Sequence, residues 1–223
     1  MSVRLAALAL VLAFSGSACG PRTELRVLSF ANGQPWSEVR LRAGLPEGRW
    51  TTWYENGQKE SEGEYEDGLR RGPWTTWWEN GHEQSETSFV AGREDGLWSY
   101  WFENGQLASQ GSNTNSLREG EWTDWYEDGV VRTRSTFRAG LEEGVAQLFW
   151  PNGKPQSEKT FLHGVLDGPF RSFREDGSKQ TEGEYQDGAK HGRWTVFQPD
   201  GSVNETLSRV FEESAAPSED EAR

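Results

Sequence analysis

A strict period of 24 residues limits what this chain can fold into. Residues 48–57 read GRWTTWYENG, and residues 72–81 read GPWTTWWENG. Close copies occupy residues 96–105 and 120–129, and looser copies begin at Gly144, Gly168 and Gly192. Since the seven starting glycines are each 24 residues apart, without insertion or deletion, the chain is a tandem array. Each unit of such an array buries its apolar side chains against its neighbours.

Most of the glycine in the chain marks fixed places in this repeat. Of 26 glycines, 21 lie on three phases. The first phase starts each copy, and the second is the glycine of the Asn-Gly or Asp-Gly pair. The third comprises Gly44, Gly68, Gly92, Gly140, Gly164 and Gly188, with Ser116 as the one substitution. Glycine therefore marks turns here and gives no sign of a phosphate-binding loop.

The local sequence predicts β-hairpins. Asn56-Gly57 stands between two strand-length segments, residues 50–55 and 58–65, and such a pair favours a type I′ turn in which both central residues have positive φ. A second turn, in residues 66–72, leads to the next hairpin. Residues 44–201 show no sustained apolar period of 3.6. We therefore expect an all-β fold of about seven tandem hairpins, forming an elongated, twisted, antiparallel single sheet.

Aromatic residues occupy four phases of the repeat. The first begins at Trp50, the second at Trp53, the third at Tyr54 and the fourth, on the returning strand, at Tyr65. In a regular strand the first and third phases face one side of the sheet and the second faces the other. Two explanations stay open: the coiled sheet partly covers both faces, or a bulge realigns the phases.

Composition excludes several classes of protein. The 223 residues include 36 acidic and 23 basic side chains, for a net charge of −13, which disfavours nucleic-acid binding. One cysteine supplies neither a disulfide framework nor a cysteine-ligated zinc site. Twelve tryptophans argue against a disordered chain. Residues 212–223 are small and acidic, however, and we expect them to form a disordered tail.

The N-terminus resembles a bacterial lipoprotein signal. Residues 5–14 form an apolar run too short to span a bilayer, and Ser17-Ala18-Cys19 follows the end of the lipobox. Gly16 departs from the usual Leu, Val or Ile, and an ordinary secretory peptide is the alternative. The resemblance implies a signal peptide at residues 1–18, lipid attachment at Cys19 and a short tether to residue 27. Because Gly20 is not the Asp that retains lipoproteins at the inner membrane, it implies the outer membrane of a bacterial envelope.

Residues 28–211 resemble an array of MORN repeats. The word Gly-x-Trp-x-x-Trp-Tyr-Glu-Asn-Gly, followed by Ser61-Glu62-Gly63 and Tyr65, is closest to a bacterial variant found in antitoxin-type proteins of toxin–antitoxin systems. The resemblance implies an array of hairpins associated with protein contacts, scaffolding and proximity to membranes. It implies no single activity. A lipoprotein signal is at odds with a cytoplasmic antitoxin, which makes that role the least favoured.

The chain shows little that predicts catalysis. His82, His163 and His191 occupy three different phases and have no metal-ligand spacing. Glutamates such as Glu55 and Glu62 recur with the scaffold, as surface residues do, and turn chemistry explains the Asn and Asp residues better than calcium binding. We predict a protein that is not an enzyme and that has no catalytic residues, metal or cofactor.

The function expected is that of a membrane-anchored interaction platform in the cell envelope. The array carries an excess of acidic residues, which favours a basic protein partner, and only the lipid anchor would contact the membrane. The alternative is a carbohydrate-binding module in which exposed Trp and Tyr rings stack on cell-wall or extracellular glycans. The third aromatic phase varies most and is therefore the candidate binding surface: Tyr54, Trp78, Phe102, Tyr126 and Trp150.

The lipid anchor gives a first prediction. Replacing Cys19 with Ser removes the thiol that would carry the lipid, so cells expressing Cys19→Ser should incorporate no radiolabelled palmitate into this protein. Unchanged labelling, or an unchanged membrane fraction, would contradict the assignment.

Overall fold

The computed structural model describes residues 7–13 and 22–211. In these ranges the chain forms β-strands, turns and bends and no helix. By its contacts the described chain divides into two units, residues 7–13, 22–118 and 127–129 in the first and residues 119–126 and 130–211 in the second. Cys19 and the predicted acidic tail, residues 212–223, lie outside the described residues.

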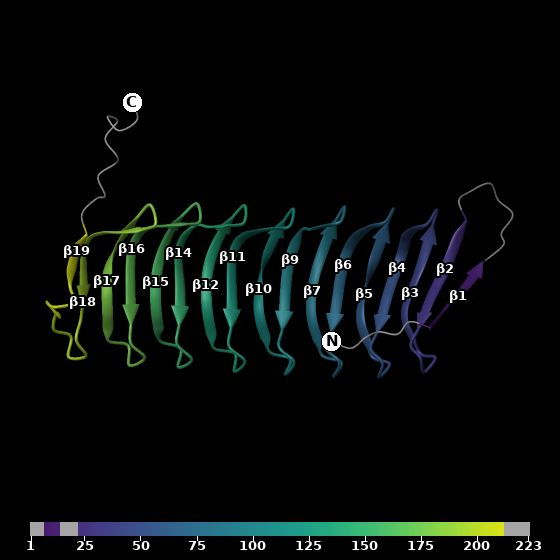
Figure 1. The fold of residues 1–223 in the computed structure, drawn as a ribbon, viewed down its shortest axis with the longest axis horizontal. Helices are drawn as coiled ribbons and strands as arrows, with labels where there is room; N and C mark the ends of the chain where they lie inside the picture. The colour runs from purple at the N-terminus through teal and green to yellow at the C-terminus, as the bar shows by residue number, and fades with distance from the viewer. Residues whose placement is uncertain (1–6, 14–21, 212–223) are drawn as a thin grey trace, which may run out of the picture. The chain divides into compact units, whose positions relative to one another are not determined.

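The first unit is an open antiparallel sheet in which strands next to each other in sequence also lie side by side (Figure 1). The strands pair in antiparallel fashion in chain order, from β1 with β2 through β9 with β10. Its strands are β1 (Ala7–Ala13), β2 (Thr23–Ser29), β3 (Pro35–Arg42), β4 (Leu45–Trp53), β5 (Lys59–Glu66), β6 (Leu69–Trp77), β7 (Glu83–Val90), β8 (Arg93–Glu94), β9 (Gly96–Trp101) and β10 (Leu107–Thr114).

The second unit repeats this plan (Figure 1). Antiparallel pairing runs in chain order from β11 to β19. Its strands are β11 (Leu117–Trp125), β12 (Val131–Arg138), β13 (Leu141–Glu142), β14 (Gly144–Phe149), β15 (Pro155–Leu162), β16 (Val165–Phe173), β17 (Lys179–Gln186), β18 (Ala189–Val196) and β19 (Arg209–Phe211). The prediction of an all-β chain built from tandem hairpins is confirmed.

The Asn-Gly turn differs from the predicted type I′. Gly57 N–H donates to Tyr54 O at 3.0 Å and Tyr54 N–H to Gln58 O at 2.8 Å, which encloses a three-residue loop. Gly57 has φ +85°, whereas Asn56 is not among the residues of positive φ. The strand register shifts between Thr52 and Trp53. This is a three-residue loop closed by a glycine bulge, so Asn-Gly alone did not determine the loop length. We call this end of each hairpin the long-turn end.

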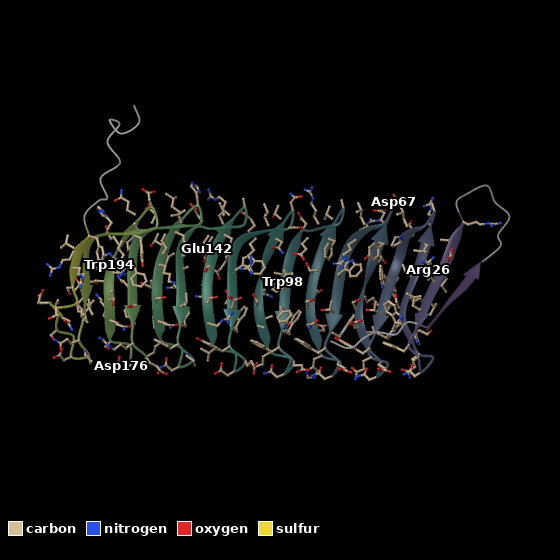
Figure 2. The ribbon with its side chains drawn as sticks, viewed as in Figure 1. Arg26, Asp67, Trp98, Glu142, Asp176 and Trp194 are labelled. Atoms are coloured by element: carbon tan, nitrogen blue, oxygen red, sulfur yellow. The ribbon has the colours of Figure 1, made fainter. Side chains whose placement is uncertain are left out.

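The type I′ geometry occurs instead at the other end of the strands, which we call the short-turn end. Asp67 and Gly68 connect β5 to β6 with φ +49° and +82°, and Figure 2 shows Asp67 at this end. Both central residues of a type I′ turn need positive φ, which favours glycine at the third phase, and Ser116 adopts φ +65° at the one position without it. Its first position tolerates other residues, because Ala91 and His163 adopt the same conformation.

The two faces of the sheet settle the question of aromatic parity. Trp50 pairs with Gly63, and Trp53 pairs with Lys59. On the Trp50 face, which carries Trp50 and every 24th residue after it, the rings of Trp50, Tyr65 and Trp74 follow one another with centroids 5.0 and 5.2 Å apart. On the opposite face, the Trp53 face, the second-phase rings are half-buried. The strands hold aromatics on both faces, and no bulge moves them to one side.

Glycine on the returning strand makes room for two tryptophans of the Trp50 face, Trp74 and Trp194. A Cβ atom at Gly63 would lie 2.2 Å from the indole ring of Trp74, so the ring occupies the space that a side chain would fill. Trp74 is 6% exposed, and its Nε1 donates to Glu64 O at 3.2 Å. The second unit repeats the arrangement with Gly183 and Trp194.

The sheet is longer at its start than predicted. We expected the array to begin at residue 28, but β2 begins at Thr23 and pairs with β1, which lies within the predicted signal peptide. At the other end, the period places Arg209 where earlier copies have an aromatic residue. The structure puts Phe211 there instead: it pairs with Gly192, and its ring lies 6.3 Å from that of Trp194.

The close packing of Trp74 on Gly63 gives a second prediction. Gly63→Ala should lower the free energy of unfolding by about 2 kcal/mol, because the added methyl group displaces a buried ring. The measurement is the urea midpoint and slope. The control is Ser135→Ala. Ser135 stands at the repeat position of Gly63, but Ala146 stands there in place of Trp74, so the substitution should have little effect on stability. Equal stability of Gly63→Ala and the wild type would contradict the prediction.

Candidate binding surface

The aromatics predicted as the binding surface bond to the next repeat. Tyr54 Oη donates to Trp77 O at 2.7 Å, and Trp78 Nε1 donates to Trp101 O at 3.0 Å. In the second unit Tyr126 Oη donates to Phe149 O at 2.9 Å and Trp150 Nε1 to Phe173 O at 3.2 Å. All five predicted residues, including Phe102, are half-buried. The polar ends of Tyr54, Trp78, Tyr126 and Trp150 thus join neighbouring hairpins, whereas the Phe102 side chain has no hydrogen-bonding group.

A signal for this role was present in the sequence. The third phase varies among Tyr, Trp, Phe, Arg and Gln, and every type except Phe carries a side-chain hydrogen-bond donor. The arginine copy behaves like the aromatics, since Arg174 Nη2 donates to Phe197 O. The property retained among the varied residues is a donor at the end of a long side chain, and we had taken the variation as a sign of exposure.

The turn asparagines form a second set of bonds between repeats. Asn56 Oδ1 accepts from Gln58 N–H at 2.9 Å, and its Nδ2 donates to Glu79 O of the next copy at 2.8 Å. Asn80, Asn104 and Asn152 repeat this pair of bonds. Asp176 keeps only the acceptor half, and hydrogen bonds from Ser178 lower the pKa of its carboxyl. Figure 2 shows Asp176 at the long-turn end of its unit.

The Trp53 face presents aromatic groups that are not used in this way. Its half-buried rings are Trp53, Trp77 and Trp101 in the first unit and Trp125, Phe149, Phe173 and Phe197 in the second. In the described part of the chain, no hydrogen bond occupies the indole N–H of Trp53, Trp77, Trp101 or Trp125, and these groups are not among its buried unpaired atoms. Half-exposed indoles with an available N–H are typical of binding interfaces. These residues were not among those predicted as the binding surface, because the prediction rested on the variation of the third phase.

Ion pairs border this row of rings. Lys59 Nζ lies 2.8 Å from Glu62 Oε2 and 5.5 Å from the centroid of the Trp77 ring. The hydrogen bond from Lys59 is the main cause that lowers the pKa of Glu62, and the positive charges of Lys59 and Arg49 add to it. In the second unit Lys179 lies 2.7 Å from Glu182 and 5.3 Å from the Phe197 ring. The same combination of ring, ammonium and carboxylate therefore occurs in both units.

The three histidines lie at different places in the repeat, as their spacing in the sequence indicates. His82 Nδ1 is 2.9 Å from Glu103 O at a long turn, and His163 Nδ1 is 3.5 Å from Glu143 Oε2 at a short turn, while His191 lies in β18. Across residues 7–13 and 22–211 there is no group of three or more His, Cys, Asp or Glu side chains arranged to hold a metal ion. The same residues contain no helix of the length and apolarity needed to cross a membrane.

Comparison with known families agrees with this geometry. Four segments of the chain match the MORN repeat variant. MORN repeats commonly mediate contacts with proteins or membranes. The chain matches no curated protein. The matched segments are residues 46–67, 94–113, 118–139 and 142–163.

Each matched MORN segment spans one hairpin about its long turn. Residues 46–67, for example, cover nearly all of β4 and β5 and end at the first residue of the short turn. The hairpin of residues 72–89 lies outside the matched segments, yet its Asn80 repeats both bonds of Asn56. The family unit and the structural unit therefore coincide.

The carboxylate beside Trp77 gives a third prediction. Because Lys59 holds the pKa of Glu62 below its ordinary value of 4.5, Lys59→Gln should raise it toward that value. A lowered folded-state pKa stabilises the protein above the unfolded-state value, and that contribution is lost as pH falls through the folded-state pKa. NMR titration of the Glu62 carboxyl carbon measures the shift. An unchanged pKa in Lys59→Gln would contradict the assignment, and Lys154→Gln, at another repeat phase, is the control.

Proposed function

We propose that this chain is a non-catalytic binding protein whose Trp53 face receives a protein partner. The main support is that Trp53, Trp77 and Trp101 recur on one face. Their indole N–H groups have no acceptor in the described chain. Ring faces, unoccupied donors and nearby Lys–Glu pairs provide both apolar area and polar contacts.

The spacing of these rings favours an extended contact. Trp53 and Trp77 lie at the ends of β4 and β6, which are separated by the single strand β5. Two strand spacings amount to about 10 Å, so one partner segment laid across a unit can contact several rings. Repeat arrays commonly use such extended surfaces for binding.

Charge favours a basic partner. The chain carries a net charge of −13, and Glu62 and Glu86 lie on strands that alternate with those bearing the Trp53-face rings. Acidic groups beside aromatic rings attract Lys and Arg side chains, and Arg stacks on aromatic faces as well. Long-range attraction of this kind raises the rate of association and falls as salt is added.

The location that we propose rests on the sequence of the N-terminal residues. The lipoprotein-like signal and Cys19 support anchoring in the bacterial envelope, with Gly20 favouring the outer membrane. The array would then lie close to the membrane surface, bound to it through lipid alone. An antitoxin role is less compatible with that location.

Glycan binding is the second candidate, and the same face favours it. Indole rings at regular intervals stack on sugar rings, and neighbouring carboxylates such as Glu62 accept hydrogen bonds from hydroxyl groups. The predicted third-phase residues, such as Tyr54 and Trp78, would contribute ring edges at the long-turn end. The two candidate functions differ in the ligand that the Trp53 face binds, which is a protein in the first and a glycan in the second.

A fourth prediction tests the proposed function. A crosslinked pull-down from envelope fractions with the intact chain should recover a discrete protein partner, and the double variant Trp77→Ala, Trp101→Ala should reduce its recovery at least about tenfold, as loss of interface anchors does. Thermal melting confirms that the variant is folded. Trp78→Phe is the matched control: it removes one third-phase donor and leaves the Trp53 face intact.

The alternatives are distinguishable by outcome. Loss of the partner in Trp78→Phe alone would move the binding surface to the third phase. Recovery of no protein, together with retention on immobilised cell-wall glycan that the double variant loses, would replace protein binding with glycan binding.

A further inference from the structure

A carboxylate closes the short turn of the next repeat in most copies. Its oxygen accepts the backbone N–H of the first turn residue, 20 positions further along the chain. The distances are 2.8–3.2 Å, and the pairs are Glu47 with Asp67, Asp95 with Asn115, Glu119 with Ala139, Glu143 with His163, and Asp167 with Asp187. The residue before each starting glycine thus has a defined role, because it supplies an anionic acceptor for a turn amide.

Two short turns of the first unit lack this carboxylate: Thr23 stands 20 residues before the turn residue Ala43, and Arg71 stands 20 residues before Ala91. Arg71 stands at the position of Glu47 one repeat later, and the corresponding turn amide belongs to Ala91. Ala91 has the same conformation as its counterparts, with φ +49°. Among the described residues its N–H has no hydrogen-bond acceptor, although the neighbouring Gly92 N–H bonds to Arg70 O at 2.9 Å. The repeat keeps the donor and lacks the acceptor.

A hollow of about 550 Å³ lies at this place. Glu66, Asp67, Arg70, Arg71, Phe89 and Ala91 contribute to its wall. The guanidinium of Arg70 lies 4.6 Å from the centroid of the Trp74 ring and 5.1 Å from that of Phe89, and it makes no hydrogen bond in the described chain. The hollow therefore combines an unoccupied amide, a guanidinium held by two rings, and an apolar wall at Phe89.

We propose that this hollow binds a carboxylate, namely a Glu or Asp side chain of an acidic peptide segment. The chain itself identifies the ligand chemistry, because five sister sites fill the corresponding place with an Asp or Glu carboxylate. An incoming carboxylate accepts from Ala91 N–H and from the guanidinium of Arg70. Charge-assisted hydrogen bonds of this type are the strong ones.

The other charges of the wall set the selectivity. Arg71 Nη1 is 2.8 Å from Glu66 Oε1, which uses part of one guanidinium and leaves other donors of its fork available. Glu66 and Asp67 repel a group that carries two negative charges, so a carboxylate suits the site better than a phosphate. This site lies at the short-turn end, away from the strand ends that carry Trp53 and Trp77, and it does not depend on the function proposed for that face.

The test is an NMR titration of the intact chain, uniformly labelled with nitrogen-15. The probe is a synthetic peptide with the sequence of residues 212–223, which has five acidic side chains, and its counterpart has Gln and Asn at those positions. The acidic peptide should shift the Ala91 amide proton downfield in a saturable manner. The neutral peptide should leave it unchanged.

Three variants make the test decisive. Arg71→Glu restores the carboxylate of the sister sites, so it should fill the site from within and weaken peptide binding roughly tenfold or more. Arg70→Gln should weaken it similarly. Arg118→Gln, an arginine at the same phase followed by Glu119, should bind as the wild type does, and so should Trp77→Ala.

Specific outcomes would overturn the proposal. Undiminished peptide binding by Arg71→Glu, or equal binding of the neutral peptide, would show that the hollow does not select a carboxylate. Tighter saturation of the Ala91 shift by inorganic phosphate than by the peptide would do the same. A partner captured through the Trp53 face but no peptide shift would leave the proposed function standing and reject this site alone.

Discussion

The hairpins of this chain have backbone groups at their ends that their own strands do not satisfy, and in most copies the neighbouring hairpin satisfies them. At the long-turn end, third-phase side chains and turn asparagines donate to carbonyl groups one repeat ahead, as Tyr54 does to Trp77. At the short-turn end, carboxylates such as Glu47 accept turn amides. Buried or confined backbone groups need partners, so these bonds determine which residues the repeat can vary. Few rings are fully buried, which increases the importance of such contacts.

Much of the fold was predictable from the sequence, because spacing carries the information. The 24-residue period, the glycine phases and the Asn-Gly pairs define hairpins without reference to other proteins. Loop length was not predictable from Asn56-Gly57, since the same dipeptide suits a type I′ turn and a three-residue loop with a glycine bulge. The place of Phe211 was also missed, because the last connection is two residues longer than the period allows.

The candidate surface was harder to predict than the fold. Variation in the third phase suggested exposure, yet Trp78 and Trp150 use their indole N–H groups between repeats. The second phase was not predicted to bind, yet the indole N–H of Trp77 has no hydrogen bond in the described chain, and Lys59 lies over its ring. Sequence shows which side chains recur, whereas the direction in which each polar atom points depends on the strand register. The same limit applies to Arg71, whose importance is visible only when the carboxylate-to-amide bonds of the sister copies are known.

Bonds that run from each hairpin to the next make the array behave as a one-dimensional chain of coupled units. A hairpin within a unit is held on both sides, whereas a terminal hairpin is held on one, so opening proceeds by unzipping from an end. Where a copy makes fewer hydrogen bonds to its neighbour, the coupling between the two hairpins is weaker, and such opening can halt or begin there. Because the link between the copies at Arg71 and Ala91 lacks its carboxylate, occupancy of that one position would control how far a disturbance at an end travels into the first unit.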